Sequence, residues 1–127
     1  MAALPNHCRA QITIKKGHAL TDTRQVLTQF EIELNTSEES TLELLQAQVN
    51  VEALQQRGLI WKQDIYVKPQ ANTAQRDFKL LETSAYRQTL TNIFRNAAKR
   101  KSFNLEAFRF QFYVYLQEPI SEPSKVF

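Results

Sequence analysis

Apolar and polar side chains alternate along residues 8–16, the stretch CRAQITIKK. One side of this stretch carries the apolar residues Cys8, Ala10, Ile12 and Ile14. A period of two predicts a half-buried β-strand. Residues 26–34, VLTQFEIEL, alternate in the same way, with Phe30 and Ile32 on the apolar side. The polar loop between the two stretches predicts an antiparallel hairpin.

Two later segments carry apolar residues at helical spacing. The first spans residues 40–57, opens with the capping-box pair Ser40 and Glu43, and stops before Gly58. Its predicted buried stripe is Leu42, Leu45, Val49 and Ala53. The second helix is expected to begin at Thr83 or Ser84, either of which could cap it. Its predicted buried stripe is Tyr86, Leu90, Ile93, Phe94 and Ala97.

Three further strands are predicted, at residues 59–69, 77–82 and 108–116. In the first of these, Gln63 interrupts an inward row of Trp61, Ile65 and Val67. The last, FRFQFYVYL, has the clearest pattern in the chain. Its apolar face carries Phe108, Phe110, Phe112, Val114 and Leu116. A strand this apolar on one face is expected at the centre of the sheet, with Phe110 and Phe112 in one core with Ile12, Ile14, Phe30 and Ile32.

The opposite face of the last strand is the first candidate binding surface. It carries Arg109, Gln111, Tyr113 and Tyr115, and Lys62 and Tyr66 are expected to face the same way from the third strand. Tyr and Arg are enriched at binding hot spots, so these residues are predicted to contact a protein partner. The alternative is that the tyrosines are present for their strand propensity alone.

The predicted order is strand, strand, helix, strand, strand, helix, strand, an α+β fold with a mixed sheet and two helices. Over residues 8–117 this order resembles the ubiquitin-like β-grasp superfamily, in which the last strand returns to the middle of the sheet beside the first. The alternative is a ferredoxin-like sandwich built from residues 26–117, with the first strand as an addition. We expect a flexible N-terminus at 1–7, a single domain at 8–117 and a disordered tail at 118–127.

The resemblance implies a protein–protein interaction module of ubiquitin-like type. The residues 124–127, SKVF, carry no Gly-Gly, so we do not expect a conjugated modifier. The second helix is longer than the ubiquitin turn, as in the Phox-and-Bem-type domains, which join head to tail through a basic cluster and an acidic loop. Lys15 and Lys16 end the first strand where such a lysine lies. The matching acidic loop is absent from this sequence.

The net charge of +3 is unevenly distributed along the chain. An acidic patch is predicted from Glu31, Glu33, Glu38, Glu39 and Glu43. A basic patch is predicted from Arg95, Lys99, Arg100 and Lys101. If these patches lie on different sides, copies of the chain could associate head to tail. The alternative function is a small nucleic-acid-binding domain that uses the basic second helix and the Tyr113/Tyr115 face.

No motif in the sequence indicates catalysis. His7 and Cys8 are adjacent, which does not give a zinc site, and His18 lies in a predicted turn. Gly17 and Gly58 are the only glycines, too few for a phosphate-binding loop. We therefore expect no enzymatic activity, no cofactor and no metal. No apolar run approaches a membrane span, and the expected location is cytoplasmic or nuclear.

Overall fold

The computed structural model describes residues 4–21, 23–37, 41–53, 55–56 and 58–118 of the chain. In chain order, the elements are β1 (His7–Lys16), β2 (Val26–Asn35), α1 (Leu42–Ala53), β3 (Ile60–Trp61), β4 (Tyr66–Val67), the 3-10 turn η1 (Gln75–Asp77), β5 (Lys79–Leu80), the 3-10 turn η2 (Thr83–Ala85), α2 (Tyr86–Ala98) and β6 (Arg109–Gln117). The fold is α+β, as the sequence predicts. The third predicted strand is divided into β3 and β4, and the fourth is shortened to β5.

Within the described residues, six strands form one mixed sheet in the order β2-β1-β6-β4-β5, and β3 pairs separately with β6. β1 and β6 lie parallel at the centre, from Arg9 opposite Arg109 to Lys16 opposite Leu116. β2 pairs antiparallel with β1, and β4 pairs antiparallel with β6. A ferredoxin-like sandwich would pair β2 directly with the last strand. The observed order does not agree with that alternative, because β1 lies between them.

The β1–β2 turn is held together by Thr23. Its Oγ1 donates a hydrogen bond of 2.5 Å to the main-chain oxygen of Lys16. Gly17 has a φ of +142°, and a Cβ at this position would lie 2.8 Å from Thr23 Oγ1. Because real Cβ atoms do not approach other atoms so closely, any other residue at position 17 would force Thr23 to move, and the positive φ also favours glycine.

A bulge separates β3 from β4. Trp61 pairs with Leu116 and Tyr66 pairs with Tyr113, so residues 62–65 lie opposite only residues 114–115. Gln63 has a φ of +71° within this bulge. Trp61 Nε1 donates to the main-chain oxygen of Asp64 at 3.0 Å and closes it. The continuous strand predicted at 59–69 is therefore wrong at these residues, although Ile65 and Val67 are buried as expected.

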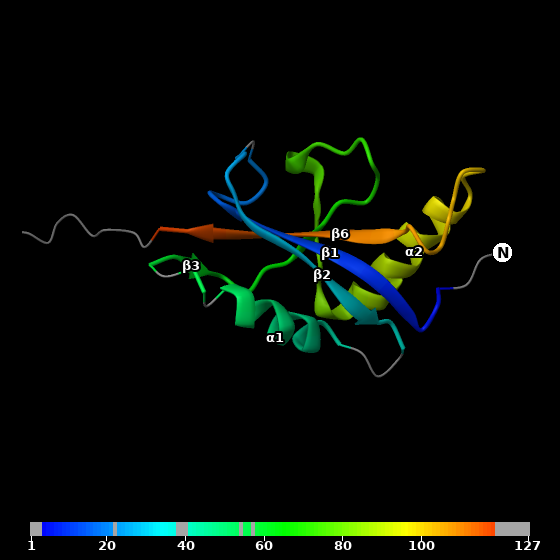
Figure 1. Ribbon diagram of the computed structural model, residues 1–127, viewed down its shortest axis with the longest axis horizontal. Helices are drawn as coiled ribbons and strands as arrows, with labels where there is room; N and C mark the ends of the chain where they lie inside the picture. Colours follow the sequence, from blue (N-terminus) through cyan, green and yellow to red (C-terminus); the bar gives the residue numbers. More distant parts are fainter. Residues whose placement is uncertain (1–3, 22, 38–40, 54, 57, 119–127) are drawn as a thin grey trace, which may run out of the picture.

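α1 and α2 cover one face of the sheet, here called the inner face (Figure 1). The predicted buried stripe of α1 is confirmed: Leu42, Leu45, Val49 and Ala53 are buried. Thr41 Oγ1 accepts a hydrogen bond of 3.4 Å from the Leu44 main-chain nitrogen at its start. Ser40, the predicted capping residue, lies outside the described residues.

The start of α2 differs from the prediction. Thr83 and Ser84 belong to η2, and α2 begins at Tyr86 without a side-chain hydrogen bond at its cap residue, Ala85. Its buried residues are Tyr86, Leu90, Ile93 and Phe94. Ala97, the last member of the predicted stripe, is only partly buried.

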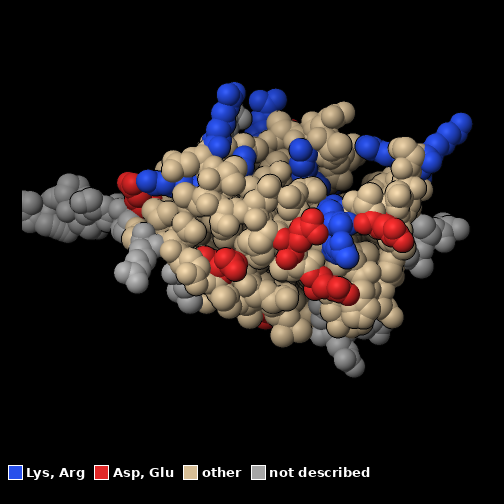
Figure 2. Space-filling model, in the orientation of Figure 1, with Lys and Arg blue, Asp and Glu red and all other residues tan. Residues whose placement is uncertain are grey.

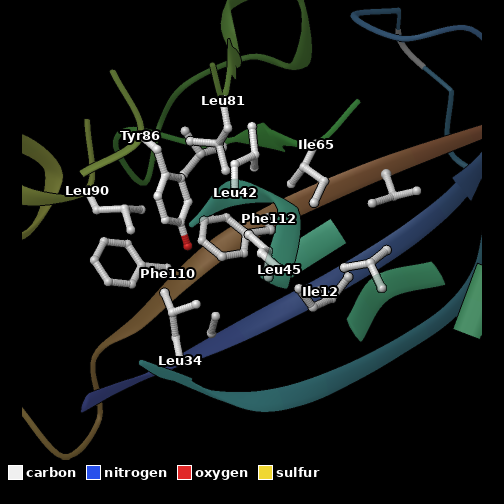
Figure 3. Close-up of a cluster of buried hydrophobic side chains, with 14 of the residues drawn as sticks. Ile12, Leu34, Leu42, Leu45, Ile65, Leu81, Tyr86, Leu90, Phe110 and Phe112 are labelled. Carbon is white, nitrogen blue, oxygen red and sulfur yellow. The ribbon is translucent and has the colours of Figure 1, made fainter. Parts of the chain in front are cut away.

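The core lies between the inner face of the sheet and the two helices (Figure 3). Ile12 and Ile14 of β1 and Phe112 of β6 are 0% exposed, and Phe110 is 1% exposed. Phe30 and Ile32 lie on the edge strand β2 and are only partly buried against this core. Burial of apolar area at about 25 cal/mol per Å² is the dominant favourable term in folding.

The segment before β1 is attached to the domain. The Thr36 main-chain nitrogen donates to the Asn6 main-chain oxygen at 2.7 Å, and Thr36 Oγ1 donates to the Pro5 main-chain oxygen. Glu118, after β6, forms an ion pair of 2.8 Å with Lys16. The rest of the predicted tail, residues 119–127, lies outside the described residues. In the described part of the chain, no helix has the length and apolar character needed to span a membrane.

Candidate functional site

The face of the sheet opposite the helices is here called the outer face. It is the face for which the sequence pattern predicts contact with a protein partner. The parallel register sets the alternate residues of β1 beside those of β6. The four pairs are Arg9 with Arg109, Gln11 with Gln111, Thr13 with Tyr113, and Lys15 with Tyr115. The strand phase predicted for β6 is therefore confirmed, since Phe110, Phe112, Val114 and Leu116 are buried on the inner face.

The tyrosine end of the outer face is covered by the chain itself. The covering segment, residues 70–78, crosses the sheet on the side away from α1 and α2 (Figure 1). Phe78 is 6% exposed, and its ring centroid lies 4.6 Å from that of Tyr113. Tyr115 is 4% exposed and contacts Tyr66 edge to face at 5.7 Å. The prediction that Tyr115 is exposed is wrong, because the covering segment removes it from solvent.

Hydrogen bonds hold the covering segment in place. Tyr115 Oη donates to Gln75 Oε1 at 2.8 Å, and Gln75 Nε2 donates to the main-chain oxygen of Thr23 at 2.9 Å. Lys15 Nζ donates to the same oxygen at 3.2 Å and lies 5.4 Å from the centroid of the Tyr113 ring. The segment is thus joined to β6 and to the β1–β2 turn at once.

Burial under the covering segment shifts the ionisation of these side chains. It raises the pKa of Tyr115 above its ordinary value, with further contributions from Tyr113 and Tyr66. Burial also raises the pKa of Tyr113. The pKa of Lys15 is lowered, first by burial and then by the positive charge of Lys68. Both tyrosines therefore stay neutral in the physiological range and act as hydrogen-bonding and packing groups.

The other end of the outer face is not covered by the segment. We call it the open half-face and define it by Arg9, Gln11, Glu31, Glu33, Arg109 and Gln111. Arg109 Nε donates to Glu31 Oε1 at 3.1 Å, and Arg109 Nη1 donates to the main-chain oxygen of Glu106 at 2.7 Å. The Arg109 side chain is only 18% exposed, so it is held in a fixed orientation by these contacts.

Two predicted binding residues come from the divided third strand. Tyr66 lies on the outer face of β4 beside Tyr115 and is partly buried there. Lys62 is exposed, but it lies in the bulge between β3 and β4. The predicted set of Arg109, Gln111, Tyr113, Tyr115, Lys62 and Tyr66 is therefore divided: Arg109 and Gln111 remain in the open half-face, and the tyrosines lie next to or beneath the covering segment.

The predicted basic patch lies at the end of α2. Arg95, Lys99, Arg100 and Lys101 are all exposed. Basic side chains gather along the upper margin in Figure 2, over the β1–β2 turn, the segment around η1 and the turn after α2. Acidic side chains lie below this margin, over β2 and its neighbours.

The described members of the predicted acidic patch do not form one surface. Glu31 and Glu33 lie on the outer face of β2, whereas Glu43 lies on α1, which covers the inner face. Glu31 pairs with Arg109, and Glu33 lies opposite Arg9 in the sheet. Glu38 and Glu39 lie outside the described residues. A single acidic surface for head-to-tail association is therefore not present among Glu31, Glu33 and Glu43.

The residues considered for metal binding or catalysis differ in their burial. Cys8 is buried, which raises its pKa, while His7 is exposed and His18 lies in the β1–β2 turn. In the described ranges, no three His, Cys, Asp or Glu side chains gather closely enough to hold a metal ion.

The sequence interpretation missed the covering segment. Residues 69–77 contain polar and small residues that predict a loop, and Phe78, which falls in the strand predicted at 77–82, is the residue that marks the contact with the sheet. The available sequence signal for the covering segment is Phe78 itself, an isolated aromatic residue after a polar loop. Its spacing of three from Leu81 places the two side chains on opposite sides of an extended chain. The hydrogen bonds of Gln75 have no sequence signal, because they depend on the return of the chain over β6.

Comparison of the chain with protein-family models, curated proteins and solved structures gives no match in any of the three.

Proposed function

We propose that this protein is a protein–protein interaction module with a ubiquitin-like β-grasp fold and no enzymatic activity, and that it binds its partner through the open half-face. The observation that carries this proposal is the uncovered end of the outer face beside the covered tyrosine end. One end of the face is closed by the chain's own Phe78 and Gln75, whereas the side chains of Gln11 and Gln111 stay partly exposed.

The strand pairing supports the fold in this proposal. In the β-grasp, the last strand returns to the middle of the sheet beside the first. Here β6 lies parallel to β1 over eight paired positions, with β2 on one side and β4 on the other. α1 follows the first hairpin and covers one face (Figure 1). Fold and function are separate claims, so the binding role depends on the surface and not on the topology.

The composition of the open half-face suits a polar protein interface. Arg9, Glu33, Glu31 and Arg109 place both signs of charge beside the amides of Gln11 and Gln111. Complementary charges at an interface fix the register and exclude wrong partners more than they raise affinity. The fixed Arg109 side chain presents its charge at little further entropy cost.

The test is site-specific photo-crosslinking in extracts of the native host. A photoreactive residue is placed at Gln11 in the open half-face, and a matched control is placed at Gln48, which is exposed on α1. We expect a defined protein to be captured from position 11 and not from position 48. Binding of that protein, once purified, should be weakened by Gln11→Arg. Capture of the same proteins from both positions, or of none, would contradict the proposal.

A second candidate is nucleic-acid binding by the basic patch. The gathering of basic side chains along one margin supports it (Figure 2). The burial of Tyr115 and the packing of Phe78 on Tyr113 argue against base stacking on the tyrosines. Filter binding with single- and double-stranded oligonucleotides tests this role. Binding that persists near physiological salt, and is lost when Lys99, Arg100 and Lys101 are changed to Glu, would favour it over the first proposal.

A further inference from the structure

A groove of about 660 Å³ lies where β4 departs from β6. The main-chain nitrogen of Lys68 donates to the Gln111 oxygen at 2.9 Å, and Pro69, which has no N–H, follows. Residues 68–71 form one wall of the groove, the end of α2 forms another, and residues 107–111 lie between them. The edge of β6 at residues 109–111 therefore extends beyond its neighbour β4.

The main chain of β6 presents hydrogen-bonding groups to this groove. Gln111 directs its main-chain oxygen toward β4, since it accepts from Lys68. Main-chain groups of a strand point to alternate sides with a period of two, so Arg109 directs its own groups to the same side. In the described residues, β4 pairs with β6 at Tyr113 and Phe112, and Lys68 continues this pairing to Gln111. Beyond that bond, the main chain of Arg109 is the part of the β6 edge that an added segment can pair with.

The charges lining the groove are all positive. Lys68, Arg100 and Arg109 line it, and no Asp or Glu is among its lining residues. Arg109 is already paired with Glu31. Among the described residues, Lys68 and Arg100 have no acid within ion-pair distance. A carboxylate entering the groove would therefore meet two cations that are not neutralised by this chain.

The floor of the groove is apolar and fixed. Ile93 of α2 and Phe110 of β6 line it and are 8% and 1% exposed. Phe108 also lines it and packs edge to face on Phe94 with ring centroids 5.4 Å apart. Phe103 packs on Phe94 at 5.6 Å, which anchors the turn that follows Arg100. Because Ile93 and Phe110 are already buried, the apolar area open to a ligand's aliphatic side chain is that of the partly buried Phe108 and Ala97.

We propose that this groove binds an extended acidic peptide segment of the partner protein, which pairs with the main chain of β6 at Arg109. The proposal rests on the proposed function and specifies the partner's chemistry. The peptide's carboxylates contact Lys68 and Arg100, its main chain pairs with Arg109, and an aliphatic side chain covers Phe108 and Ala97. The mixed charges of the open half-face contact the rest of the partner.

The experiment selects peptides from a random-peptide phage library on the immobilised protein. The variant Lys68→Glu/Arg100→Glu serves for counter-selection, and both residues are solvent-accessible, so the fold should be retained and is checked by circular dichroism. We expect enriched peptides in which Asp or Glu lies beside aliphatic residues. A synthetic enriched peptide should lose about tenfold or more in affinity for the double variant, since the reversal places two Glu side chains against its carboxylates and like charges across an interface oppose binding.

Two controls define the outcome. Lys99→Glu/Lys101→Glu makes the same change in net charge outside the groove and should change affinity by less than about threefold, because exposed charges are screened. Bound peptide should slow amide hydrogen exchange at Arg109. Equal losses in both double variants, or failure to enrich any acidic peptide, would overturn the inference. If a partner still crosslinks at Gln11, the proposed function stands; if that capture fails as well, both are rejected.

Discussion

Tyr115 Oη donates a hydrogen bond of 2.8 Å to Gln75 Oε1, a residue 40 positions earlier in the chain. The same Gln75 side chain donates from Nε2 to the Thr23 main-chain oxygen. One glutamine thus joins the last strand, the covering segment and the β1–β2 turn. The tyrosine end of the outer face is closed by this bond together with the contact between Phe78 and Tyr113.

We expect Gln75→Ala to lower the free energy of unfolding by about 1–3 kcal/mol, because Tyr115 Oη then stays buried without this acceptor. Urea denaturation measures the change. Gln70→Ala, an exposed residue of the same segment, is the matched control and should have an effect within about 0.5 kcal/mol. In Gln75→Ala/Tyr115→Phe the losses should be smaller than the sum of the single changes. Strictly additive losses would mean that the two side chains do not interact.

The raised pKa of Tyr115 predicts a loss of stability at alkaline pH. In the unfolded chain a tyrosine loses its proton near pH 10, while the folded chain retains it to higher pH. Above about pH 10 the folded state therefore binds more protons, and the free energy of unfolding falls as pH rises. Lys15, whose pKa is lowered, acts in the opposite direction. Tyr115→Phe should make the alkaline decline shallower in denaturation curves; an unchanged slope would refute the assignment to Tyr115.

Phe110→Ala should lower the free energy of unfolding by about 3–5 kcal/mol, because it leaves a cavity among fully buried side chains. Chemical denaturation gives the value. Leu44→Ala removes an apolar side chain that is 57% exposed on α1 and should change stability little. Similar effects of the two substitutions would contradict the assigned inner face of β6.

The two glycines should differ in their tolerance of alanine. Both have positive φ. A Cβ added at Gly17 would lie 2.8 Å from Thr23 Oγ1, whereas a Cβ added at Gly58 would meet no atom within 4 Å. Gly58→Ala should cost about 1–2 kcal/mol from backbone strain alone. Gly17→Ala should cost more, since Thr23 must also move. Thermal denaturation of the two variants tests this order, and an equal effect would show that the β1–β2 turn relaxes freely.

The residues that pack between the sheet and the helices could be predicted from the sequence. Burial of one face gives apolar residues at a regular spacing along each strand and helix. The alternation in β1 and β6 fixes which side chains meet α1 and α2, and Phe110 and Phe112 lie where their spacing predicts. The division of the third strand has a weaker signal in Gln63. The predicted start of α2 is wrong, since Thr83 and Ser84 form a 3-10 turn before it.

The candidate site could be predicted less well, because it depends on contacts between distant residues. Tyr113 and Tyr115 have the pattern of a solvent-facing row, and only the return of Phe78 and Gln75 covers them. The positive groove likewise combines Lys68 with Arg100, which are far apart in sequence. Local periodicity contains no information about such pairs.

The parallel contact between β1 and β6 has a consequence for folding during synthesis. β1 is synthesised early, but its neighbour on one side is β6, the last strand described. β1 and β2 can therefore pair with each other, but β1 cannot pair fully with β6 until Gln117 has left the ribosome. During that interval β1, which carries Ile12 and Ile14, lacks its neighbour β6 along one edge. Long-range pairing of this kind slows folding and prolongs exposure of apolar surface. Nascent chains that stop before Arg109 should therefore be targets for chaperones.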